Sequence, residues 1–194
     1  IGAAGLTRRI AARLGAPALL QPFSRLVIDC NRPPEALDAM PAEIHGVAVP
    51  GNRDPGSRGA RVREIFAPFQ AEVARRIAEP GRRLLISVHS FTPKLGGAAR
   101  PWEIGLCYRE DAETAGRLAR ALTARRPGLV LGMNQPYGID DAGDWFVPRH
   151  AEPSGLAHCL IEIRNDLGAE PAGQALWGDL LAAALADLIL QGDA

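Results

Sequence analysis

The sequence predicts an α/β fold, and two observations support that prediction. Short apolar runs of strand length alternate along the chain with longer segments that have the 3.6-residue period of amphipathic helices. The chain has 194 residues, of which 47% are hydrophobic and 23% charged, which is the balance of a folded globular protein. This length suffices for a sizeable core, so we expect residues 1–194 to form a single domain.

Four segments have helical periodicity. In the first, Leu6, Ile10 and Leu14 recur every four residues, and the second ends before Pro80 and Gly81. The last segment is apolar on more than one side, so the sheet or a partner subunit must cover it, and a homo-oligomer is compatible with this pattern. The expected helices are 3–14, 62–77, 113–124 and 171–189.

Five apolar runs are expected to form buried strands. Polar residues directly follow the first two runs, where open α/β sheets place ligand-binding residues. Residues 33–58 are rich in Pro, Gly and Asp without a sustained period, which indicates a loop that borders the site. The expected strands are 26–28, 84–88, 104–108, 129–132 and 159–163.

Composition narrows the class of partner and the compartment. Lys plus Arg number 22, as do Asp plus Glu, so there is no net charge to attract nucleic acid. The three cysteines lie far apart in apolar runs, which indicates reduced thiols and a cytoplasmic protein. No stretch approaches the ~20 apolar residues of a membrane span, so no membrane partner is expected. Because the chain begins at Ile1 inside a helical pattern, we expect a further N-terminal segment in the intact protein.

The first group of candidate residues surrounds the run 26–28. Arg25 and Arg32 bracket this run and are placed to bind one anionic ligand, because guanidinium groups bind carboxylates through two parallel hydrogen bonds. An ion pair of Asp29 with either arginine is an equally good interpretation. Asn31 belongs to the same group.

The second candidate is His89, which directly follows the run that ends at Val88. A histidine at the end of a buried strand can coordinate a metal through one ring nitrogen while a neighbour holds the other. A hydrogen-bonded structural histidine is the alternative. No G-x-S-x-G motif surrounds Ser87 or Ser90, which disfavours a serine nucleophile.

The third group is Glu162 with Arg164 and Asp166. A glutamate in the middle of an apolar strand is costly to bury as an unpaired charge, so it must pair with Arg164 or line a cavity. A carboxylate in a cavity is suited to act as a general base that activates water. The alternative is a Glu162–Arg164 pair on a solvated strand face. Turns at 100–105, 134–137 and 149–150 are interpreted as structural.

Five motifs along the chain resemble those of the N-formylglutamate amidohydrolases, in the order of that family, and span nearly the whole sequence. This family is itself similar to the zinc carboxypeptidases and aspartoacylases. The motifs are SRLVIDCNR from Ser24, HSFTP from His89, RPWEIG from Arg100, NQPY from Asn134 and IEIR from Ile161.

The resemblance implies a three-layer α/β/α fold with a central mixed, mostly parallel sheet of the phosphorylase/hydrolase-like kind. It also implies hydrolysis of an N-formyl or N-acyl amino acid with the help of Zn²⁺. His89 matches a metal ligand of the family, and Glu162 matches the glutamate that activates the metal-bound water. The substrate-binding residues that we assign on this basis are Arg25, Asn31, Arg32 and Arg164.

Two departures from the family pattern suggest an alternative function. A catalytic zinc site usually has about three protein ligands, and members of the family supply the others from a segment that precedes the position of Ile1. Glu103 stands where a histidine is common in the family, and Gln135 where a glutamate is common. The alternative is a catalytically silent relative that binds an acidic small molecule. His45, in the long loop, is a further candidate ligand.

Overall fold

The computed structural model describes residues 1–44 and 46–191, in which the chain divides into two compact units. The first unit comprises Ile1–Ala18, Arg83–Ile139 and Gly155–Ala194, and the second comprises Leu19–Arg82 and Asp140–Ser154. The single domain expected from the length stays a prediction.

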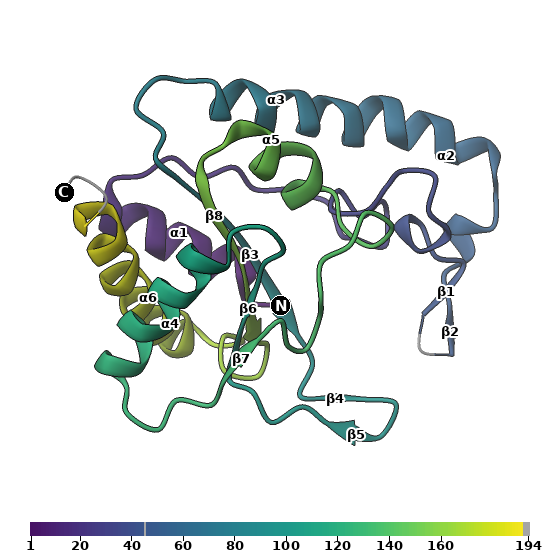
Figure 1. The fold of residues 1–194 in the computed structure, drawn as a ribbon. Helices are drawn as coiled ribbons and strands as arrows, with labels where there is room; N and C mark the ends of the chain where they lie inside the picture. Colours follow the sequence, from purple (N-terminus) through teal and green to yellow (C-terminus); the bar gives the residue numbers. More distant parts are fainter. Residues whose placement is uncertain (45, 192–194) are drawn as a thin grey trace. The chain divides into compact units, whose positions relative to one another are not determined.

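The first unit is built on a four-stranded sheet with the strand order β3-β8-β6-β7. Its strands are β3 (Leu84–Phe91), β8 (Ala157–Arg164), β6 (Ile104–Cys107) and β7 (Leu131–Met133). β3 runs parallel to β8 and β6 parallel to β7, whereas β8 and β6 are antiparallel. This mixed, mostly parallel sheet with its helices confirms the expected α/β fold (Figure 1).

Three helices, α1 (Ala3–Leu14), α4 (Ala112–Arg125) and α6 (Pro171–Gln191), pack together beside this sheet (Figure 1). Alternate residues of the central strands meet them in one hydrophobic core. Each fully buried aliphatic side chain contributes roughly 1.5–3 kcal/mol to stability. Among the core residues with 0% exposure are Leu6, Ile104, Leu106, Leu118, Leu122, Cys159, Ile161, Ile163 and Leu181.

The helix α6 is longer and more apolar than we expected of any segment of this sequence. Within the described residues, the segment Pro171–Leu190 is long and apolar enough to cross a membrane by length and composition. This is weak evidence for a membrane span, because a core helix of a soluble protein passes the same test. Trp177, Leu181 and Leu185 of α6 are buried in the core, which accounts for part of its apolar character. The cytoplasmic location stays a prediction.

The second unit is organised around the helical segment 56–77. It consists of α2 (Gly56–Arg61), a π-helical stretch at Val62–Phe66 and α3 (Ala67–Ile77), so the helix expected over 62–77 is confirmed and begins earlier. Phe66 joins Ile28, Cys30 and Met40 in a separate small core.

Short elements complete the two units. The first unit also contains the strand pair β4 (Lys94–Leu95) and β5 (Ala98–Ala99). The second unit contains the antiparallel strands β1 (Glu43–Ile44) and β2 (Val47–Ala48), which lie within the expected loop 33–58. The remaining short helices of the second unit are η1 (Leu37–Ala39), η2 (Pro50–Asn52), η4 (Val147–Ala151) and α5 (Glu152–Ser154).

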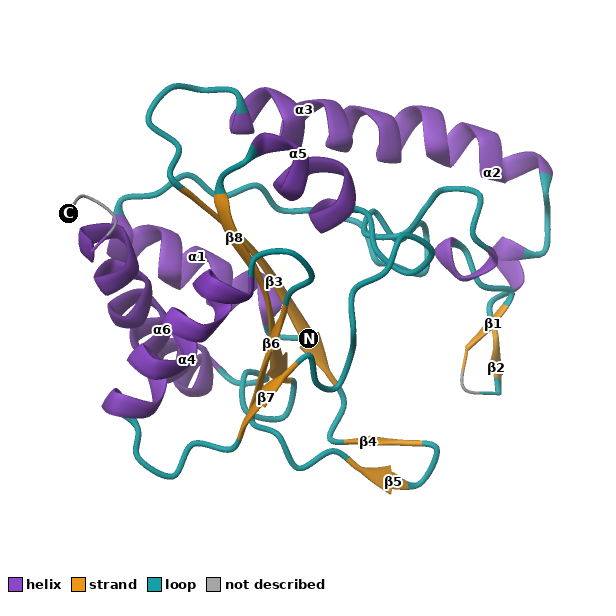
Figure 2. Cartoon of the chain, in the orientation of Figure 1, coloured by secondary structure: helices purple, strands orange, loops and turns teal. Residues whose placement is uncertain are grey.

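The strand expected at 26–28 is wrong. Figure 2 shows the chain between α1 and α2 largely as loop, and residues 25–27 form a turn in which Val27 N donates to Ser24 O at 2.8 Å. Side chains, and not a neighbouring strand, donate hydrogen bonds to the backbone carbonyls of this segment: Asn52 Nδ2 donates to Leu26 O and Arg61 donates to Val27 O, each at 2.8 Å. The burial of Ile28 therefore reflects the small core and not a sheet.

The second strand is longer than the sequence predicts. The run expected at 84–88 continues to Phe91, so His89 lies inside β3 and does not follow it. This difference decides the direction of the imidazole, because successive side chains of a strand point to opposite faces of the sheet.

Candidate functional site

His89 and Glu162 lie side by side in neighbouring strands. His89 of β3 is the register partner of Glu162 in β8, and Gly105 of β6 is the partner of Glu162 on its other side. Register partners in adjacent strands project from the same face of a sheet. The imidazole and the carboxylate therefore share one face of the sheet, although they are far apart in the sequence.

This face is opposite the main core. Ile161 and Ile163, the neighbours of Glu162 in β8, both belong to the hydrophobic core that α1, α4 and α6 complete. Because strand residues alternate between the two faces, Glu162 points to the other side, and it is only 7% exposed. The carboxylate is therefore largely withdrawn from solvent on the face opposite the core.

The ring of His89 is held by its own strand. Ser87 Oγ lies 2.9 Å from His89 Nε2, and the donor in this hydrogen bond depends on the tautomer of the ring. Ser87 is two positions earlier in β3 and shares the face of His89. The hydroxyl therefore orients the imidazole, a contact that the sequence did not reveal.

A loop covers the sheet directly beside Glu162. The face occupied by Glu162 continues across Gly105 of β6 to its partner Gly132 of β7. A Cβ atom at Gly105 would lie 1.9 Å from the backbone oxygen of Gln135 and 3.4 Å from Glu162 Cβ. Both glycines are therefore needed for the close approach of residue 135, since a Cβ at Gly132 would lie 2.6 Å from Gln135 Cβ.

Asn134 fixes the start of this loop. Its backbone N–H donates to Leu106 O, and its side-chain Oδ1 accepts from the backbone N–H of Tyr108, each at 2.9 Å. Its φ of 51° lies in the left-handed region, which asparagine tolerates better than most residues. Sequence reasoning interprets the turns 100–105 and 134–137 as structural; the glycine inside a buried strand was the available signal that a segment approaches there.

The sequence left open whether Glu162 pairs with Arg164 on a solvated strand face, and the contacts of Arg164 bear on this. Its Nε donates to Asp166 Oδ1 at 2.8 Å, at the end of β8. Glu162 is buried, so a Glu162–Arg164 pair on a solvated strand face does not describe the arrangement.

The other candidate residues lie in the second unit, where they hold the loops. Arg25 pairs with Asp29 at 2.7 Å, and Arg32 lies 4.0 Å from Asp29 and 3.4 Å from Asp38. Arg32 also donates to Gly143 O. The ion pair of Asp29 with either arginine, one of the two interpretations left open by the sequence, is thus present for both.

Asn31 connects two segments of the second unit. Its Nδ2 donates to Asp144 Oδ1 at 3.0 Å, and its Oδ1 accepts from the backbone N–H of Phe146 at 2.9 Å. Burial raises the pKa of Asp144 above the ordinary value, against the opposing effects of Arg32 and Asn31. These contacts give Asn31 a structural role in addition to any contact with a ligand.

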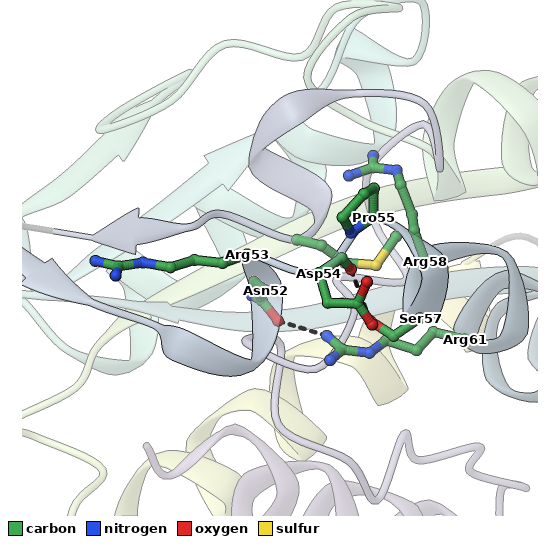
Figure 3. Close-up of a pocket in the computed structure, with 8 residues that line it drawn as sticks. Asn52, Arg53, Asp54, Pro55, Ser57, Arg58 and Arg61 are labelled. Atoms are coloured by element: carbon green, nitrogen blue, oxygen red, sulfur yellow. Dashed lines mark hydrogen bonds between the residues drawn. The ribbon is translucent and has the colours of Figure 1, made fainter.

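A pocket in the second unit is built from the loop 33–58 and from α2 (Figure 3). Its arginines bind main-chain oxygens: Arg58 donates to Pro34 O and Ala36 O, and Arg61 donates to Val27 O. Asp54 brings a carboxylate into the same pocket. These bonds stabilise the loop, and the pocket contains none of the candidate site residues. Its lining residues are Met40, Asn52, Arg53, Asp54, Pro55, Ser57, Arg58 and Arg61.

Comparison with known proteins identifies the family. The family model of N-formylglutamate amidohydrolase matches residues 1–168. The chain belongs to the N-formylglutamate amidohydrolase family. The resemblance inferred from the five motifs is thereby confirmed. A comparison with curated proteins gives no match.

Three solved structures are similar to this chain in fold. The gene product Atu2144 from Agrobacterium tumefaciens is 38% identical, with a TM-score of 0.81 over 96% of this chain and 77% of its own. The N-formylglutamate amidohydrolase from Ralstonia eutropha JMP134 is 17% identical, with a TM-score of 0.68 over 98% of this chain and 82% of its own. The CwlD amidase from Clostridioides difficile is 9% identical, with a TM-score of 0.51 over 95% and 83%. The last two likenesses show the fold alone.

The residues present fall short of a complete zinc site of the kind expected for the N-formylglutamate amidohydrolase family. Within 1–44 and 46–191, no group of three His, Cys, Asp or Glu side chains is placed to hold a metal ion. A catalytic zinc site usually has about three protein ligands. His89 and Glu162 are neighbours, but two side chains do not make up that set. His45 lies outside the described residues.

The close approach at Gly105 predicts the effect of adding one methyl group there. Gly105→Ala places a Cβ against the backbone oxygen of Gln135, so the loop must move, and we expect a destabilisation of about 1–3 kcal/mol. Thermal unfolding measures this effect. Gly116→Ala in α4 is the control, because its Cβ would meet only the end of the Arg120 side chain at 3.6 Å. Equal melting temperatures for Gly105→Ala and the wild type would contradict the packing described.

Proposed function

We propose that this chain hydrolyses the amide bond of an N-formyl or N-acyl amino acid, with Glu162 as the catalytic base. Two findings support this proposal. The chain belongs to a family of amidohydrolases, and a buried glutamate stands beside a histidine on the sheet face opposite the core. The second finding is the more specific, because two side chains that can exchange protons lie together and neither belongs to the hydrophobic core.

Glu162 acts on water and on the leaving group. Its carboxylate takes one proton from a water molecule, whose oxygen forms a bond to the acyl carbon. The C–N bond then breaks, and the proton held by Glu162 passes to the leaving nitrogen. The products are a carboxylic acid and an amino acid. His89, oriented by Ser87, lies next to the base in β3.

The substrate is a small molecule with a carboxylate. Arg25, Asn31, Arg32 and Arg164 are proposed to contact it, as the family resemblance implies. In the structure each of the three arginines is paired with an aspartate, Asp29 or Asp166. A substrate carboxylate therefore competes with these aspartates for the guanidinium groups.

Removal of the base should separate catalysis from folding. Glu162→Gln removes the proton acceptor and little volume, so we expect kcat to fall by about 10²–10⁴ while the melting temperature changes little. Hydrolysis of N-formyl-L-glutamate measures kcat. Glu103→Gln is the matched control, because Glu103 is a partly buried carboxylate of the same unit that pairs with Arg126. If Glu162→Gln turns over as fast as the wild type, Glu162 is not the base.

Zinc dependence is a separate proposal, and His89 is its candidate ligand. We expect a chelator to abolish hydrolysis, added Zn²⁺ to restore it, and His89→Ala to lower the zinc content measured by elemental analysis. Activity that survives exhaustive chelation would exclude zinc. If the wild type binds N-formyl-L-glutamate but never hydrolyses it, even with zinc, the chain is instead a catalytically silent binder of an acidic small molecule.

A further inference from the structure

Arg100 is the most buried arginine in the described part of the chain, with 8% exposure. Its guanidinium donates to Tyr137 Oη at 2.8 Å. Its Cζ lies 5.0 Å from the centre of the Tyr137 ring and 6.0 Å from that of the Phe91 ring. No ion pair among residues 1–44 and 46–191 includes Arg100.

Arg126, in the same unit, is a useful comparison, because it has both an aromatic contact and a carboxylate partner. Arg126 also stacks on an aromatic ring, with its Cζ 4.7 Å from the centre of Trp177. In addition it pairs with the Glu103 carboxylate at 2.5 Å, although it is more exposed than Arg100. Cation–π contacts offset only part of the cost of removing a guanidinium from water, and a carboxylate partner offsets much more. Among the described residues, the environment of Arg100 thus lacks the anion that its burial favours.

Arg100 lies on the same face as the candidate catalytic pair. Phe91 follows His89 by two positions in β3, so its ring projects from the face of His89 and Glu162. The other ring, that of Tyr137, belongs to the loop that covers Gly105 beside Glu162, and Tyr137 O accepts from Cys107 Sγ at 3.2 Å. Tyr137 is 42% exposed, so the cover of Arg100 borders solvent.

Phe91 lies two positions, or roughly 7 Å, along β3 from His89, and Glu162 lies on the neighbouring strand. The α-carboxylate of an acylated amino acid is only two bonds from the acylated nitrogen, so it would stay beside Glu162 when the amide is bound there. A carboxylate at the end of the side chain extends further along the sheet, towards Phe91 and Arg100.

We infer that Arg100 binds a carboxylate of the substrate and so determines that the amino-acid part must be anionic. This inference rests on the proposed function, because it names a group that binds the substrate of that reaction. Tyr137 is a positioning residue: its hydroxyl accepts a hydrogen bond from the guanidinium, and its ring lies against it.

The experiment compares a substrate with and without carboxylates. Hydrolysis of N-formyl-L-glutamate and of its uncharged diamide is measured for the wild type, Arg100→Gln and Arg100→Lys. We expect Arg100→Gln to raise KM for the acid by about tenfold or more with little change in kcat, and to change KM for the diamide little, because uniform binding is lost only where a carboxylate is present. Arg100→Lys should fall between the two, since it keeps the charge without the planar fork.

Arg149→Gln is the matched control, because Arg149 also stacks on an aromatic ring, 5.6 Å from the centre of Trp145, but is exposed and belongs to the second unit. Arg149→Gln should leave KM and kcat unchanged for both the acid and the diamide. Equal losses on the acid and the diamide with Arg100→Gln, or no loss on either, overturn the assignment of Arg100. If Arg100→Gln does not fold, Tyr137→Phe replaces it and should raise KM for the acid alone; unchanged KM values overturn the assignment.

Calorimetric titration with N-formyl-L-glutamate separates this inference from the proposed function. If the wild type hydrolyses neither compound, the proposed function fails. Arg100 is then still supported when the wild type binds the acid and Arg100→Gln binds it at least tenfold more weakly. Equal binding by both proteins, or binding by neither, overturns the inference.

Discussion

The arrangement of the site depends on the parallel register between β3 and β8. This register pairs His89 with Glu162, and the alternation of side chains in each strand gives one face of the sheet to the core and the other to the polar pair. A shift of one residue in either strand would send one of the two side chains into the hydrophobic core. The burial of Ile161 and Ile163 on the core face therefore also fixes the direction of Glu162.

In the row of residues that continues from this pair across β6 and β7, both positions are glycines, which have no side chains. Gly105 and Gly132 continue the face of Glu162 across β6 and β7, and the backbone of Gln135 lies in the space that side chains would fill. The loop that begins at Asn134 thus reduces the exposure of Glu162 from one side, and through Tyr137 it also contacts Arg100. Burial of the carboxylate and burial of the guanidinium have a common structural cause.

Periodicity alone predicted the elements with strong patterns. The helices expected over 3–14, 113–124 and 171–189 are all present, with ends within two residues of those expected. The strand expected at 26–28 is absent because its backbone is satisfied by a turn and by the side chains of Asn52 and Arg61, which no local pattern reveals. Three apolar residues in a row can be buried by a small core as well as by a sheet.

The site could be predicted only in part, for a related reason. His89 and Glu162 are conspicuous in the sequence because each interrupts or ends an apolar run. Their adjacency depends on strand register, and the buried position of Arg100 depends on two rings from distant segments. Contacts between segments that are far apart in the sequence leave no trace in hydrophobic periodicity, so Arg100 looked like an ordinary turn residue.

A double-mutant cycle on His89 and Glu162 measures whether these two neighbouring side chains act together. kcat/KM for N-formyl-L-glutamate is measured in the wild type, in His89→Gln, in Glu162→Gln and in the double variant. If the two side chains act as one unit on the same substrate, the double variant loses about as much as the worse single variant. Losses that multiply would show that His89 and Glu162 act independently, and would contradict a shared site on this face of the sheet.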